Sequence, residues 1–197
     1  MEPTGRIFTD TSDYYEIGPG DEIQVGGRSF LVTGEEREYR FGIEDPKFWV
    51  KKVIERDTQE RKILKLSFAE SFMTYLGSVP VHCFRDPAKE AAILKLVAGR
   101  PEFMQGSAYA DSRGNIVRVL DIVRGINFLN HVVEFRMPHE IYFQTKLPGI
   151  LRRLIPAIDA IGFLHQHGFR HGDLRNDHVY VTHEDGRYVW IDFDYDF

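Results

Sequence analysis

The chain has 197 residues, of which 43% are hydrophobic and 28% charged, and its formal net charge is -5 at pH 7. These ordinary globular proportions exclude a wholly disordered or collagen-like chain, and the acidic balance provides no basic field for nucleic acid. The single cysteine, Cys83, excludes an internal disulfide and a cysteine-cluster metal site. No apolar run is long enough for a membrane span, and the first residues lack a signal-peptide pattern. We therefore expect a cytoplasmic protein with no nucleic-acid or membrane partner.

The first half of the chain is predicted to be rich in β-strands. Residues 1–20, rich in Gly, Pro, Thr and Asp, indicate an irregular arm. Five strand-like segments follow, separated by turn-forming residues, at 22–25, 29–33, 38–42, 48–55 and 62–68. The first two are joined by Gly26-Gly27, which is typical of a tight hairpin. We expect an antiparallel meander.

One helix with clear end signals interrupts the strands. Asp86 is placed to cap it, Pro87 suits its first position, and the helical pattern runs to Val97 before Gly99. Two more strands, at 104–110 and 116–123, are expected on either side of a polar turn.

The second half changes to a helical period. Apolar residues between Ile150 and Leu164 predict one long helix that ends near Gly168. A short hairpin, 179–182 and 188–193, follows it. The sequence predicts an α+β fold of two lobes: an N-terminal arm and extra β-hairpin (1–35), an antiparallel β-rich lobe with one main helix (36–125), and a mostly helical lobe (126–197).

Two charged residues interrupt apolar patterns. Strand alternation places Lys65 between apolar neighbours, and helical spacing places Glu90 on the same stripe as Ile93, Leu94 and Val97. A buried charge needs a partner, so the two residues are predicted to pair with each other. The alternative is that each reaches solvent independently at the edge of the lobe.

A dense polar segment, Arg170–His178, lies between the long helix and the last hairpin. Loops held by a rigid scaffold are where catalytic groups collect. Asp192 stands fourteen residues later among Trp190, Ile191 and Phe193, where a solvated acidic turn is a poor explanation. Asp173 and Asp192 could together hold a hard cation and orient a hydroxyl group.

Four motifs in chain order resemble the protein-kinase-like superfamily, in particular aminoglycoside phosphotransferases, choline kinases and atypical bacterial serine/threonine kinases. RKILKLSF resembles the third strand, DPAKEAAILKL the helix that carries its glutamate partner, HGDLRNDH the catalytic loop, and IDFDYDF the metal-binding segment. The resemblance covers about residues 36–197. It implies a two-lobe kinase-like fold with a partial C-terminal lobe. Two explanations of the partial lobe stay open: the sequence is truncated there, or the chain completes the lobe by association.

The resemblance assigns a role to five residues. It implies that Lys65, held by Glu90, binds the α and β phosphates of ATP. It implies that Asp173 orients the attacking hydroxyl and accepts its proton, and that Asp192 binds Mg²⁺, or Mn²⁺ in its place. Arg175 stands where a cation near the transferred phosphate is expected, although a salt bridge to a neighbouring carboxylate explains it equally well.

Two positions depart from the superfamily pattern. His178 occupies the place of an asparagine that ligates the second metal ion, and imidazole suits Mg²⁺ poorly. The stretch Phe41–Val50 corresponds to the phosphate-covering loop, yet it contains one glycine, Gly42. Both departures favour weaker or altered nucleotide and metal binding. His171 is expected to support the loop.

Three functions compete for this sequence. The first is an ATP- and metal-dependent phosphotransferase that acts on a hydroxyl of a small molecule or protein. The second is a pseudokinase, a nucleotide-binding or regulatory module without transfer. The third is a metal-dependent hydrolase that uses four histidines, His165, His167, His171 and His178; the helical spacing of the first two opposes it, because they do not share a face.

Overall fold

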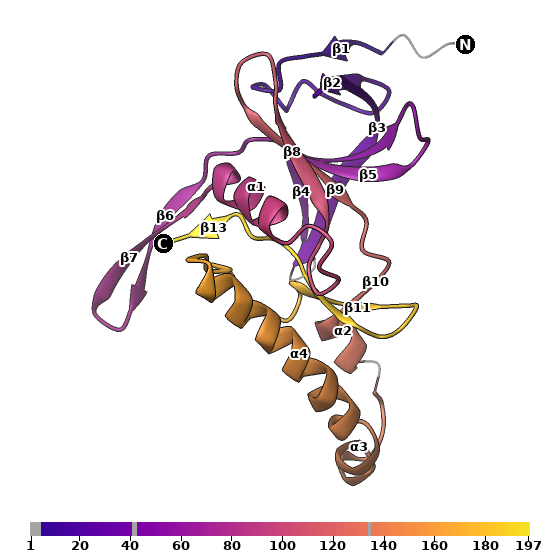
Figure 1. Cartoon of the computed structure of the whole chain (residues 1–197), viewed down its shortest axis with the longest axis vertical. Helices are drawn as coiled ribbons and strands as arrows, with labels where there is room; N and C mark the ends of the chain where they lie inside the picture. Colours follow the sequence, from indigo (N-terminus) through magenta and orange to yellow (C-terminus); the bar gives the residue numbers. More distant parts are fainter. Residues whose placement is uncertain (1–4, 41–42, 134) are drawn as a thin grey trace. The chain divides into compact units, whose positions relative to one another are not determined.

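The computed structural model describes residues 5–40, 43–133 and 135–197 (Figure 1). The chain forms two compact units, each built from two separate segments. The first unit comprises Met1–Glu70 and Gly106–Ile122, and the second comprises Ser71–Gln105 and Val123–Phe197. The helix around Glu90 is therefore part of the same unit as the C-terminal segment of the chain.

The first unit is a seven-stranded sheet in the order β1-β2-β3-β4-β5-β9-β8. The strands are β1 (Ile7–Phe8), β2 (Glu22–Val25), β3 (Arg28–Arg40), β4 (Ile43–Glu55), β5 (Arg61–Lys65), β8 (Gly106–Ala110) and β9 (Ile116–Asp121). All neighbours are antiparallel except β1 and β2. The predicted meander is confirmed, but the arm contributes a short parallel strand in place of purely irregular chain.

The largest difference from the predicted strands lies at β3 and β4. The segment expected at 29–33 and the described part of the segment expected at 38–42 belong to one strand, β3, which ends at Arg40 and pairs with β4 through two register shifts. Pro46 is one of the turn-forming residues expected between the segments 38–42 and 48–55, and in the structure it is part of β4. Proline is tolerated there because β4 pairs with β5 only from Val50 to Ile54, so the position has a strand on one side. Gly42 lies outside the described residues.

The core of the first unit comes mainly from alternate positions of these strands, with Ile17 and Leu66 added from outside them. Side chains that point to one face of a strand recur every second residue, so apolar residues at those positions share one layer. The buried cluster consists of Ile17, Ile23, Val25, Phe30, Val32, Val53, Leu64, Leu66, Val117 and Val119.

The second unit combines four helices with two small antiparallel sheets. The helices are α1 (Pro87–Leu96), α2 (Phe128–Val133), α3 (His139–Thr145) and α4 (Leu147–Gln166). One sheet contains β10 (Gly125–Asn127), β11 (Val179–Thr182) and β12 (Tyr188–Trp190), and the other contains β13 (Tyr195–Asp196), β7 (Val79–Arg85) and β6 (Ser71–Leu76). Within the described residues, no helix is both long and apolar enough to cross a membrane.

Both predicted helices form, but α4 buries only part of its apolar surface. The Asp86 side chain accepts hydrogen bonds from the amides of Ala88 and Lys89, which caps α1 as expected. On α4, Ile150, Ala157, Ala160, Ile161 and Leu164 are buried. Other apolar residues of α4 that were expected to be covered are exposed, namely Leu151, Ile155 and Ile158.

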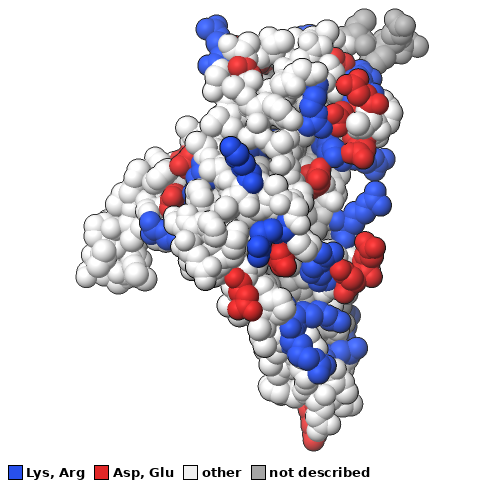
Figure 2. All heavy atoms as spheres, viewed as in Figure 1, with Lys and Arg blue, Asp and Glu red and all other residues white. Residues whose placement is uncertain are grey.

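The β6–β7 hairpin was not predicted. It extends away from α1 and α4, and its surface carries almost no charge (Figures 1 and 2). Its large side chains are exposed, including Phe72, Met73, Tyr75, Leu76 and Val79. Because neither face is covered, the strands lack the alternation of apolar and polar residues that identifies a half-buried strand. β13 pairs with the base of this hairpin, with Tyr195 opposite Arg85.

Candidate active site

The polar loop, Arg170–His178, follows helix α4 closely in the chain. The helix ends at Gln166 with His167 as its C-cap, and Gly168, with φ +80°, turns the chain away from it. On the far side of the loop, the Trp190 indole Nε1 donates to the Ala157 carbonyl at 2.7 Å, which fixes β12 on α4. The loop is therefore held between two packed elements.

Gly172 is required by the close approach of another segment. Its φ is +88°, a conformation that side chains rarely adopt, and a Cβ at this position would lie 1.8 Å from the Tyr195 carbonyl oxygen. The polar loop and the segment after Asp192 thus touch through backbone alone at this point.

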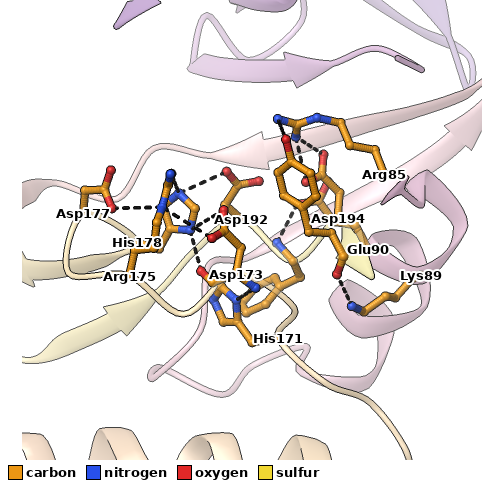
Figure 3. A network of polar contacts seen from close by, with 12 residues as sticks. Arg85, Lys89, Glu90, His171, Asp173, Arg175, Asp177, His178, Asp192 and Asp194 are labelled. Atoms are coloured by element: carbon orange, nitrogen blue, oxygen red, sulfur yellow. Dashed lines mark hydrogen bonds and ion pairs between the residues drawn. The ribbon is translucent and has the colours of Figure 1, made fainter. Parts of the chain in front are cut away.

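Four of the predicted site residues are brought together at the loop. Figure 3 shows Asp173, Arg175 and His178 from the loop beside Asp192 from the segment after β12. His178 Nε2 lies 3.5 Å from Asp192 Oδ2, and His178 Nδ1 lies 3.6 Å from Asp173 Oδ2. The two carboxylates predicted to act together therefore lie on either side of one imidazole ring.

Arg175 lies in the same cluster and contacts acidic side chains. Its Nε lies 3.5 Å from Asp173 Oδ1 and 3.3 Å from Asp177 Oδ1. Its Nη2 donates to His178 Nε2 at 2.5 Å. Of the two explanations left open for Arg175 by the sequence, the contact with neighbouring carboxylates is the one observed.

Asp192 has an unusual backbone conformation that ends β12 early. Its φ is +66°, in the left-handed region, and the strand predicted to run to Phe193 stops at Trp190. Non-glycine residues held in this region cluster at functional sites, because the conformation is costly and persists only where its surroundings impose it.

The neighbours of Asp192 supply that constraint from both sides. The Ile191 amide donates to the His178 carbonyl at 3.1 Å, and the Phe193 amide donates to Glu90 Oε1 at 3.3 Å. Glu90 is fully buried, and α1 thereby holds the Asp192 segment directly. The sequence predicted a buried Glu90 but not this contact.

A second group of charges, which the sequence analysis missed, holds Asp194 and Tyr195. Arg85 Nη1 donates to both Asp194 carboxylate oxygens at 2.9 and 3.0 Å, and Arg85 Nη2 donates to the Tyr195 hydroxyl at 2.9 Å. The Lys89 ammonium donates to the Tyr195 carbonyl, and its burial lowers the pKa of Lys89. The only signal for this group in the sequence is that the acidic Asp194 lies next to the aromatic Tyr195.

His171 is buried beneath the loop, as expected for a supporting residue. It is 1% exposed, and its ring packs on Trp190 and Phe193 with centroid separations of 5.5 and 5.0 Å. Burial lowers the pKa of His171 to about 4, with the nearby His178 adding to the effect. A neutral imidazole thus forms part of the floor of the site.

Lys65 lies in the first unit, at the end of β5, and is buried as predicted. Its predicted partner Glu90 lies in the second unit, and the pairing of the two stays a prediction. Among the described residues, no three His, Cys, Asp or Glu side chains are arranged to hold a metal ion by themselves. This leaves no ligand set for the four-histidine hydrolase in the described part of the chain.

The comparisons with known proteins identify the fold. No family model matches the chain, and no curated protein matches it in sequence. Among solved structures it is similar to a mutant of the PknI kinase domain of Mycobacterium tuberculosis, with 16% identity and a TM-score of 0.49, covering 86% of this chain and 60% of that one. It is also similar to PpkA-294 in its apo form, with 19% identity and a TM-score of 0.51, covering 83% of this chain and 58% of that one. A third similar structure is Rad53 1-466 in complex with AMP-PNP, with 19% identity and a TM-score of 0.45, covering 73% of this chain and 34% of that one.

The chain has a protein-kinase-like α+β fold, and that prediction is confirmed by the likeness to PpkA-294. The TM-score with PpkA-294 is 0.51, and at 19% identity this likeness is one of fold. The chain spans 60% of the PknI domain, 58% of PpkA-294 and 34% of Rad53 1-466.

Proposed function

We propose that the protein is an ATP- and metal-dependent phosphotransferase that acts on a hydroxyl group of a small molecule or protein. The observation that carries the proposal is the convergence of Asp173 and Asp192 beside one loop, with Asp192 held in a left-handed conformation by hydrogen bonds on both sides. The kinase-like fold supports the same reaction class.

In the proposed reaction, Asp173 accepts the hydrogen bond of the acceptor hydroxyl. As the hydroxyl oxygen bonds to the γ-phosphorus, the bond from that phosphorus to the β–γ bridging oxygen breaks, and the hydroxyl proton passes to Asp173. ADP leaves with the bridging oxygen. The Asp173 side chain is 23% exposed, which suits a group that must reach an outside substrate.

Asp192 fits one magnesium ion. Mg²⁺ takes oxygen ligands and is usually bound by one or two carboxylates together with phosphate oxygens, so one protein carboxylate and a nucleotide are a sufficient set. The ion would neutralise the phosphate charge at this place. His178 does not fit as a ligand, because Mg²⁺ prefers oxygen and both ring nitrogens are already engaged within the protein.

Lys65 is proposed to bind the α and β phosphates, with Glu90 holding it. Lys65 is 6% exposed and Glu90 is 0% exposed, and burial of both charges is what an internal ion pair requires. Gly42 is proposed to belong to the loop that covers the nucleotide phosphates.

The test is transfer from γ-labelled ATP with Mg²⁺ or Mn²⁺, scored as autophosphorylation and as hydrolysis. The transfer rate of the Asp173→Asn variant should be about 10²–10⁴-fold lower than that of the wild type, as expected for the loss of a general base. Asp159→Asn, an exposed position on α4, is the matched control. If wild type and Asp173→Asn are equally inactive while ATP with metal still raises the melting temperature, the protein is a pseudokinase.

A further inference from the structure

The His178 ring lies between the Asp173 and Asp192 carboxylates, and hydrogen bonds at both of its nitrogen atoms hold it there. Its Nδ1 donates to the Asp173 carbonyl at 2.8 Å, so Nδ1 carries the hydrogen. The Arg175 Nη2 donates to Nε2 at 2.5 Å, so Nε2 is the acceptor of this hydrogen bond. The ring is 5% exposed, and both of its nitrogen atoms are occupied (Figure 3).

Arg175 is thereby held in one place by three groups. Its Nη2 is bound by His178, and its Nε faces the Asp173 and Asp177 carboxylates at 3.5 and 3.3 Å. The Arg175 side chain as a whole is 35% exposed, so the protein does not enclose it completely. A planar guanidinium with five donors can bind a protein carboxylate and also phosphate oxygens.

The acidic residues at this place require positive charge. Asp173 Oδ2 and Asp192 Oδ2 are the oxygens that face the imidazole ring, and two carboxylates in one site favour a nearby cation. A metal ion between them would need His178 as a ligand or would need to displace it. The Nε2 lone pair of His178 is already directed at Arg175.

We propose that the Arg175 guanidinium, positioned by His178, supplies the second positive charge of the phosphotransfer site, and that the protein uses a single divalent ion, on Asp192. This rests on the proposed phosphotransferase function. A fixed arginine near the transferring phosphoryl group neutralises developing charge in other phosphotransfer proteins, so the chemistry does not demand a second metal ion.

The proposal is tested by counting bound ions. The free Mn²⁺ signal in electron paramagnetic resonance is titrated against the whole chain at saturating AMP-PNP, and the expected result is one bound Mn²⁺ per chain. The double variant Arg175→Ala/His178→Asn removes the guanidinium and supplies an amide oxygen, and it should bind two. Arg152→Ala, which removes an exposed arginine of α4, is the matched control and should bind one.

Each outcome decides the proposal. Two ions on the wild-type chain would overturn the single-ion proposal and leave the phosphotransferase function intact. Binding of neither nucleotide nor Mn²⁺ would overturn the proposed function as well. If the double variant does not fold, as judged by circular dichroism, Arg175→Lys is used: it keeps the charge, so one ion supports the proposal and two ions contradict it.

A second readout separates positioning from stability. With one divalent ion, wild-type activity rises with free Mg²⁺ along a simple saturation curve. His178→Asn releases Arg175 from its imidazole partner, so the curve should gain a second, weaker phase while the melting temperature is recorded alongside. A change in melting temperature with an unaltered metal curve would assign His178 a purely structural role and count against the proposal.

Discussion

Lys65 on β5 lies directly opposite Arg118 on β9, and both side chains are buried, with 6% and 1% of their surface exposed. Residues directly opposite each other on neighbouring antiparallel strands point to the same face of the sheet. The first unit therefore places two buried cations side by side. Both residues also interact with other groups of the protein, and Lys65 is the one proposed to bind the nucleotide phosphates, so an anion held by Lys65 would also lie close to Arg118.

Tripolyphosphate without metal should therefore raise the melting temperature of the wild-type chain. At 100 times its dissociation constant a ligand stabilises by about 2.7 kcal/mol, which is roughly 5–10 °C for a chain of this size. Lys65→Met and Arg118→Met should each lose at least half of the shift. Arg61→Met, an exposed position of the same strand as Lys65, is the control, and an equal shift in all four proteins would contradict the prediction.

Replacement of Gly172 by alanine should destabilise the second unit. The new Cβ would collide with the Tyr195 carbonyl, and the backbone conformation itself disfavours a side chain, so a loss of more than about 2 kcal/mol is expected in urea unfolding. Gly162→Ala is the control, and it should change the free energy of unfolding in the opposite direction. Gly162 lies inside α4 with open space around it, and alanine there should add about 0.5–1 kcal/mol. Equal effects would refute the packing argument.

The burial of His171 predicts a pH-dependent stability. Its pKa is lowered to about 4 in the folded chain against an ordinary value of 6.5, so the unfolded chain binds more protons between those values. Stability should be unaffected by this residue above pH 6.5 and should fall by about 3 kcal/mol as the pH drops to 4. His171→Asn should flatten the profile, measured as urea midpoint against pH. A profile unchanged from wild type would show that His171 is not its source; His165→Asn, at an exposed position, serves as control.

The Arg85–Asp194 ion pair should be a major support of the segment that follows Asp192. Asp194 is 1% exposed and Arg85 11%, and removal of one partner leaves the other charge buried, which costs about 3–5 kcal/mol. Arg85→Ala and Asp194→Ala should therefore destabilise the chain strongly, and the double variant should cost less than the sum. The exposed pair Arg113–Asp10 provides a control, because Asp10→Asn should change stability little. Additive effects of the two buried substitutions would exclude the coupling.

The elements that the sequence predicted correctly carry strong local signals. Helix α1 has its cap and its proline at the expected positions, and the last hairpin follows from apolar segments around an acidic glycine turn. Lys65 and Glu90 were identified as buried because each interrupts an apolar period, and both are buried. The burial of a charged residue can be predicted from its neighbours in sequence. Its partner cannot, because the partner belongs to a distant segment of the chain.

The features that the sequence did not predict depend on contacts between distant segments. The left-handed backbone of Asp192 is imposed by His178 and Glu90, which lie 14 and 102 positions away. β13 exists only because β7 lies beside it. Arg118 is different: it interrupts the apolar run Ile116–Leu120 in the same way that Lys65 interrupts its own, so the same rule would have found it.

The pairing of β13 with β7 has a consequence for ligand binding. The residues that follow Asp192 are part of a sheet, with Tyr195 and Asp196 in register with Arg85 and Phe84. In the proposed function, a cation bound at Asp192 would meet a carboxylate whose backbone is already ordered, so the binding free energy would not be reduced by the entropy of ordering that segment. If Asp192 binds a metal ion as proposed, the β6–β7 hairpin would contribute to the affinity through the pairing of β7 with β13, although it is remote in sequence and its surface is exposed.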